Sequence, residues 1–189
     1  MIWCERAGKT LGKRPVRPRF STAGGNLVLA AALLPPVVNG AEALLVNPDC
    51  ASLFDVAAME STFGTTSPES ILEQAYSQNQ IRLVDFGSNI PPATMGETTG
   101  VNGTIYFASN RGFATGILAD GTPISQAPLF LGLGLTNLQI DEILLIHELL
   151  HFTGTAGDDD QNQSITLGNG DTVIGSAGIT KEVIQHCIH

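Results

Sequence analysis

The chain has 189 residues, of which 43% are hydrophobic and only 14% are charged. This length suits one domain, and the apolar content is enough for an ordinary core, which excludes a disordered chain. The net charge is −9, and from residue 44 onward 16 acidic residues stand against 3 basic ones. Such a domain would repel a phosphate backbone, so we expect no nucleic-acid partner. No apolar run reaches the ~20 residues of a spanning helix, which excludes a multi-span membrane protein.

The N-terminal segment has the three-part pattern of a secretory signal peptide. Six of the nine basic residues precede position 20, and an apolar run over 27–34 follows. Pro35-Pro36 is then expected to break the helix, and the small residues Gly40 and Ala41 offer a cleavage site. We therefore predict a signal peptide over 1–41, cleaved between 39 and 44, and a mature domain over 42–189. The alternatives are a membrane anchor, or a disordered basic tail before a buried apolar segment.

The first half of the mature domain mixes helix and strand patterns. Residues 49–60 predict a short helix, and Ser67-Pro68-Glu69 predicts the start of a second helix that runs to about Gln80. The alternation over 81–86 and the β-branched and aromatic residues of 104–108 predict two strands. Between them, 87–103 is expected to be a loop. The glycine-rich stretch 110–135 is ambiguous, with a candidate strand near 116–118.

The second half contains the clearest helix, over 137–152, which Thr136 caps and Gly154 follows. Asn169-Gly170 between the β-branched runs 164–167 and 172–174 predicts a hairpin. Residues 179–188 predict a short terminal helix. Because helices and strands do not alternate regularly, we expect an α+β fold.

Two cysteines, Cys50 and Cys187, remain near the two ends of the predicted mature chain. In an oxidising compartment they can form a disulfide, which agrees with export. The alternative is two unlinked thiols that behave as small buried hydrophobes. We expect the disulfide, and a secreted or periplasmic protein without stable membrane insertion after signal removal.

The helix over 137–152 carries His147-Glu148-Leu149-Leu150-His151, the HExxH pattern. Two histidines four residues apart lie on one face of a helix, so both can reach one metal ion. The glutamate between them can act as general base on a metal-bound water. The rest of the helix is apolar nearly all round, and burying three polar groups there without a partner would be costly. The pattern therefore predicts a metal site.

At these residues the chain resembles the zincin metallopeptidases. The resemblance covers Leu145 to Gly154 and little beyond that helix. It implies Zn²⁺ as cofactor, His147 and His151 as zinc ligands, and Glu148 as catalytic base. It also implies a small zincin-like domain with a short sheet and a central HExxH helix. Gly154 matches the metzincin extension, but Gly157 stands where that family has its third ligand, and no methionine follows Met95.

The third metal ligand has several candidates. Asp158 and Asp159 come just after two glycines that would let the chain fold back, and aspartate oxygen is an accepted zinc ligand. Glu182 on the terminal helix is the alternative, in the manner of gluzincins, while His186 and His189 are weaker candidates. Asp171 is more simply a turn residue beside Asn169-Gly170.

These features together predict a secreted zinc-dependent endopeptidase that acts on a peptide or protein substrate as a monomer. The alternative is a secreted non-catalytic metal-binding or interaction domain that retains the HExxH helix.

Overall fold

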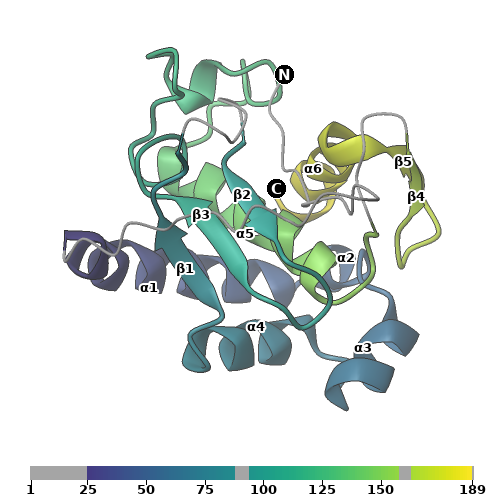
Figure 1. The fold of residues 1–189 in the computed structure, drawn as a ribbon. Coiled ribbons are helices and arrows are strands. Elements are labelled where there is room, and N and C mark those ends of the chain that lie inside the picture. Colours follow the sequence, from purple (N-terminus) through teal and green to yellow (C-terminus); the bar gives the residue numbers. More distant parts are fainter. Residues whose placement is uncertain (1–24, 88–93, 158–162, 189) are drawn as a thin grey trace, which may run out of the picture.

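The structure, a computed structural model, describes residues 25–87, 94–157 and 163–188, with side chains from residue 32 onward. Its elements in chain order are α1 (Gly25–Leu45), α2 (Pro48–Ala51), α3 (Val56–Phe63), α4 (Pro68–Ser77), β1 (Ile81–Val84), β2 (Gly96–Thr98), β3 (Ile105–Ala108), the 3₁₀ helix η1 (Ile124–Gln126), α5 (Asn137–Phe152), β4 (Ser164–Thr166), β5 (Thr172–Ile174) and α6 (Gly175–Cys187). The fold is α+β, with a small mixed sheet and a separate hairpin (Figure 1). The predicted class is confirmed.

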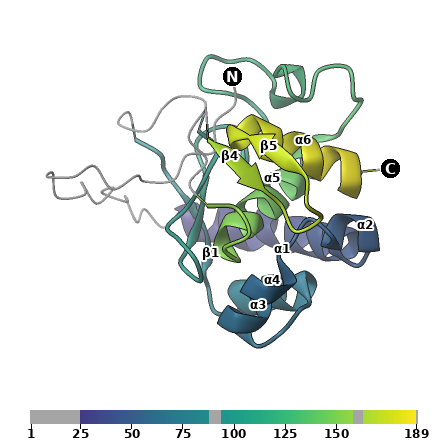
Figure 2. The ribbon, with the colours of Figure 1, turned by 90° about the vertical axis from the view of Figure 1, so that its right-hand side faces the viewer.

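The helix α5 is the centre of the molecule, and it has the bounds that the sequence predicts. Thr136 and Gln139 form a capping box, in which each side chain bonds the backbone N–H of the other residue. Every residue from Ile140 to Phe152 is buried. The helices α6, α5, α1 and α4 are stacked in that order from top to bottom in Figure 2. A helix whose residues are buried all round needs a nearly continuous apolar surface, which α5 has.

The three-stranded sheet has the order β1-β3-β2, so that β2 is an edge strand. β1 runs parallel to β3, whereas β2 runs antiparallel to it, with Glu97 opposite Tyr106. β2 lies within 87–103, which the sequence predicts as loop, and that part of the prediction is wrong. Three residues are too few to show a strand pattern, and β2 is a strand because it pairs with β3. Figure 1 shows β2 beside α5. The hydroxyl of Thr98 on β2 contacts Glu148, so this strand lies against the HExxH segment.

The helix α1 extends across the predicted boundary at residue 41. Pro35 and Pro36 do not end it, although each proline removes one helical hydrogen bond. Its inner face is buried in the main core between α5, α4 and β1, through Leu34, Val37, Val38, Ala41 and Leu45. This arrangement corresponds to the alternative of a buried apolar segment. Cleavage between 39 and 44 would remove part of this core.

Other elements also differ from the sequence-based ones. Residues 49–60 form two helices, because Asp55 bonds the N–H groups of Ala57 and Ala58 and so starts α3 anew. The helix α4 ends at Ser77, three residues before the predicted end. The candidate strand near 116–118 is only a single bridge, from Ile117 to Pro123. The helix α6 begins four residues earlier than predicted.

The hairpin and the disulfide are both confirmed. β4 pairs antiparallel with β5, with Ile165 opposite Val173. Cys50 of α2 is bonded to Cys187 at the end of α6. Gly168 lies against the backbone of Phe54, where any side chain would collide with that carbonyl. These contacts hold the C-terminal part of the chain against α2.

Within the described ranges, no helix combines the length and the apolar content that crossing a membrane would need.

Candidate metal centre

The two histidines of the HExxH pattern lie on one buried face of α5. His147 is fully buried and His151 is 4% exposed. Their Nε2 atoms are 3.3 Å apart. The helical spacing of four residues brings the rings together, because each turn carries the chain back to the same face.

The other nitrogen of each ring is held by a hydrogen bond. Nδ1 of His151 is 2.8 Å from the carbonyl oxygen of Gly157. A carbonyl can only accept, so this nitrogen carries the proton. Nδ1 of His147 is 2.9 Å from the hydroxyl of Thr180, which itself donates to the carbonyl of Ser176. When Thr180 donates its one hydroxyl proton to Ser176, it accepts from Nδ1–H of His147, and Nε2 is then the accepting nitrogen of that ring.

This geometry fits a metal ion. The two Nε2 atoms are within hydrogen-bond distance, so at this separation they can share a proton or face a common cation. A tetrahedral ion with bonds of about 2.0–2.1 Å holds two nitrogen ligands roughly 3.3–3.4 Å apart, which is the separation observed. The hydrogen bonds on Nδ1 are those that usually orient metal-binding histidines. The separation of the two Nε2 atoms is therefore compatible with two ligands of one zinc ion.

Glu148 follows His147 in α5 and is 1% exposed. Its Oε2 accepts a hydrogen bond of 2.5 Å from the hydroxyl of Thr98 on β2. Its Oε1 is buried and has no hydrogen-bond partner in the part of the chain that the structure describes. A buried carboxylate oxygen without a hydrogen bond is costly, so this oxygen is available to a donor that the described residues do not supply.

Gly154 turns the chain back toward His151 after α5. It has the left-handed φ of +82° that glycine adopts readily, and the carbonyl of Gly157 then reaches Nδ1 of His151. The two predicted third ligands, Asp158 and Asp159, follow Gly157 in the chain but lie outside the described residues. His189 lies outside them as well.

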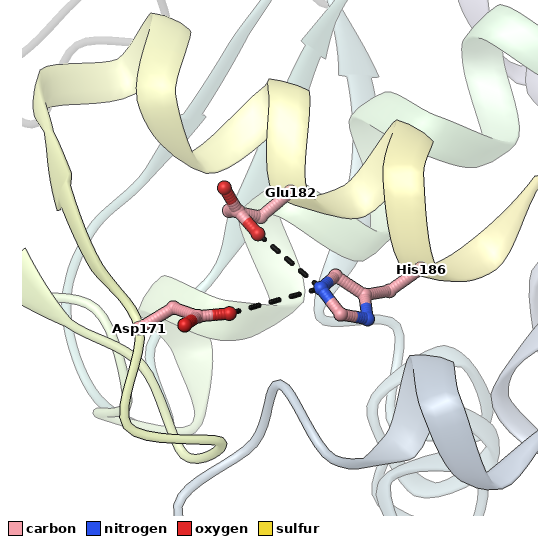
Figure 3. A group of neighbouring side chains, drawn as sticks. All are labelled: Asp171, Glu182 and His186. Atoms are coloured by element: carbon pink, nitrogen blue, oxygen red, sulfur yellow. Dashed lines mark ion pairs between the residues drawn. The ribbon is translucent and has the colours of Figure 1, made fainter.

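The alternative ligands Glu182 and His186 lie in a different group, with Asp171 of the hairpin (Figure 3). Nε2 of His186 is 3.3 Å from Glu182 Oε2 and 3.8 Å from Asp171 Oδ2. Asp171 is also a turn residue, as predicted, since its N–H bonds Asn169. Such partly exposed groups are common without a metal, and we treat this one as a set of ion pairs. Among the described contacts, α6 reaches the histidines through Thr180, two residues before Glu182.

Two acidic residues near the start of α5 are also buried. Asp141 is 4% exposed, and burial, with Glu142 beside it, raises the pKa of Asp141 to about 9. Burial likewise raises the pKa of Glu142, whose carboxylate fills the space that the absent side chain of Gly40 leaves on α1. At neutral pH Asp141 is therefore protonated, and α5 carries less negative charge than its sequence indicates.

Three residues of the site are not among the sequence-based candidates: Thr98, Thr180 and Gly96, which lies against the carboxylate of Glu148. Gly96 and Thr98 belong to the short strand β2, which has no recognisable pattern. Thr180 lies beside Ile179 on the buried face of α6. A polar residue on that apolar face is the one feature of the sequence that could have pointed to Thr180.

Comparisons of the chain with protein-family models, with curated proteins and with solved structures found no match.

Proposed function

We propose that this protein is a secreted zinc-dependent endopeptidase with a zincin-like catalytic domain. The observation that carries the proposal is the 3.3 Å separation of the two Nε2 atoms, each on a ring whose Nδ1 is hydrogen-bonded elsewhere. His147 and His151 would hold the zinc ion, with Asp158 or Asp159 as third ligand. The disulfide between Cys50 and Cys187 supports an extracytoplasmic location.

Glu148 would be the general base. Bound zinc would supply a Lewis acid that polarises the substrate carbonyl and lowers the pKa of water. Oε1 of Glu148 would accept the proton of the attacking water and pass it to the leaving amine. Thr98 holds the other oxygen, Oε2, so the carboxylate keeps one oxygen for proton transfer.

The second candidate function is a non-catalytic metal-binding or interaction domain. The histidine geometry serves a structural zinc equally well if a fourth protein ligand closes the site. The buried Oε1 of Glu148 favours catalysis, because it has no hydrogen-bond partner among the described residues and a structural site has no need of such an oxygen. A peptide or protein substrate and a monomeric state are part of the proposal.

Metal analysis and cleavage assays test the two functions in sequence. The dialysed full chain should retain one equivalent of zinc, whereas His147→Ala should retain less than about a tenth. The zinc-loaded protein should cleave members of a diverse peptide library, and a chelator should abolish cleavage until zinc is restored. A wild type without zinc contradicts the metal site. A zinc-loaded wild type that cleaves no peptide, nor denatured casein, favours the non-catalytic function.

A further inference from the structure

We propose that Gly96 and Thr98 of β2 are positioning residues that together fix the carboxylate of Glu148. This inference rests on the proposed function, because it assigns how the general base of that site is held. The two residues lie two apart on one strand, so both face α5. Each contacts a different oxygen of the same side chain.

Thr98 fixes one oxygen and therefore the rotation of the carboxylate. Its hydroxyl lies 2.5 Å from Oε2 of Glu148 and 3.2 Å from the backbone carbonyl of the same residue. Thr98 is 2% exposed, so no solvent competes for this hydroxyl. A short hydrogen bond to a buried carboxylate is among the stronger ones in proteins. With Oε2 held, rotation of the carboxylate is restricted, and Gly96 then limits where Oε1 can lie.

Gly96 provides the space for the second oxygen. A methyl group at this position would lie 2.7 Å from Oε1 and 3.0 Å from Cδ and Cγ of Glu148. The backbone of Gly96 is not in the left-handed region, so an alanine could adopt it without strain. Glycine is therefore needed here for space alone. Any side chain at residue 96 would push the carboxylate away from the place that Thr98 gives it.

A double-mutant cycle tests the contact at Gly96 without any activity assay. Gly96→Ala should lower the midpoint of thermal unfolding, and it should do so much less in a Glu148→Ala background, where the colliding atoms are gone. Gly87→Ala is the matched control, because a methyl group there would meet nothing within 4 Å. If Gly96→Ala lowers the midpoint of thermal unfolding equally in the wild-type and Glu148→Ala backgrounds, the steric role of Gly96 is overturned.

The role of Thr98 is tested with Thr98→Val, which keeps the shape and removes the hydroxyl, and with Thr98→Ser, which keeps the hydroxyl. The control is Thr94→Val, since Thr94 is fully buried and its hydroxyl has no partner in the described part of the chain. Thr98→Val and Gly96→Ala should keep one equivalent of zinc, lower kcat at least about 10-fold and change KM by less than about 3-fold. Thr98→Ser and Thr94→Val should behave as the wild type.

Crystal structures of the same variants separate this inference from the proposed function. Glu148 should leave its place in Gly96→Ala and Thr98→Val by at least about 1 Å, and keep it in Thr98→Ser. A displaced Glu148 in a protein whose wild type cleaves nothing would support the positioning role and contradict the peptidase. An unmoved Glu148, or an active Thr98→Val with wild-type kcat, would overturn the positioning role alone.

Discussion

At the residue scale, the chemistry of the site depends on which atoms are already hydrogen-bonded. The Nδ1 atoms of His147 and His151 are held by Thr180 and by the carbonyl of Gly157. Oε2 of Glu148 is held by Thr98. Each bond occupies one end of its side chain and so fixes how that side chain is oriented. Three polar side chains buried in an apolar helix are tolerated because nearly every polar atom has a partner.

Glu148→Gln separates the metal-binding role from the base role. The amide keeps the size of the side chain and a hydrogen-bonding oxygen, but it cannot accept the proton of water. Zinc content should therefore persist, while turnover falls by at least about 10²-fold. Metal analysis and peptide cleavage on the same sample measure both quantities. Loss of zinc from this variant would show that Glu148 is a ligand and that our assignment of roles is inverted.

Asp141 should make the stability of the protein decrease as the pH rises. Its pKa is about 9 in the folded protein because of burial, whereas in the unfolded chain it is roughly 3.9. Between these values the unfolded chain has released a proton that the folded protein keeps, so the free energy of unfolding falls with increasing pH. Asp141→Asn should be more stable than the wild type at pH 8, by at least about 1 kcal/mol, and this difference should vanish below about pH 4.

Denaturant unfolding at several pH values measures this effect. Asp120→Asn is the control. Hydrogen bonds from Thr122 lower the pKa of the exposed Asp120 carboxylate, so the effect of Asp120 on the pH dependence of stability has the opposite sign to that of Asp141. The contribution of Asp120 is present above its unfolded pKa and is lost as the pH falls. A wild type and an Asp141→Asn variant with parallel pH profiles would contradict the burial argument.

At the scale of elements, the site is formed by segments that contribute little chemistry themselves. β2 contributes Gly96 and Thr98, and α6 contributes Thr180 from 33 residues beyond His147. The helix α6 is held in turn by the hairpin and by the disulfide at its end. The position of Thr180 against His147 is therefore a property of how α6 packs on α5.

Thr180→Val should weaken zinc binding without unfolding the protein. The variant keeps the shape of a buried side chain but removes the acceptor for Nδ1–H of His147. Loss of such an orienting partner lowers metal affinity by about 10–100-fold. Competition with a chromophoric chelator measures the affinity, and Thr180→Ser should restore it. If Thr180→Val binds zinc as tightly as the wild type, the hydrogen bond from α6 does not orient the ligand.

At the scale of the whole molecule, the N-terminal helix belongs to the core. Leu34, Val37, Val38 and Ala41 are at most 5% exposed. Burial of each of the three larger side chains contributes about 1.5–3 kcal/mol. Their sum is comparable with the total stability of a typical domain, about 5–15 kcal/mol.

A chain of residues 42–189 should therefore lose cooperative thermal unfolding, while a chain of residues 25–189 should unfold at nearly the temperature of the full chain. Circular dichroism measures both. Ala41→Asp and Ala43→Asp are a matched pair in the same helix, since Ala41 is buried and Ala43 is exposed, and only Ala41→Asp should be strongly destabilising. A stable 42–189 chain would instead agree with the signal boundary at residue 41.

The disulfide should stabilise the folded protein mainly through the unfolded chain. Cys50 and Cys187 are 137 residues apart, and closing a loop of this length removes chain entropy worth about 5 kcal/mol. The Cys50→Ala/Cys187→Ala double variant should lose stability on this order in denaturant unfolding. Reductant should destabilise the wild type and leave the double variant unchanged. A wild type that is insensitive to reductant would contradict the prediction.

Local patterns in the sequence were enough for α5, the hairpin and the histidine pair. Each of these depends on residues at most a few positions apart. The start of α5 depends on Thr136, the hairpin on Asn169-Gly170, and the histidine pair on the spacing of His147 and His151. The disulfide was predictable because two cysteines remain in the proposed mature chain. These features need no knowledge of what packs against them.

The tertiary structure alone decided β2, the partners of the site and the place of α1. Gly96 and Thr98 meet Glu148 across about fifty residues, and Thr180 meets His147 across 33. A three-residue strand exists because a neighbouring strand pairs with it, and a helix that contains two prolines persists because its apolar face is buried. Contacts between distant segments determine such features, so no local pattern in the sequence encodes them.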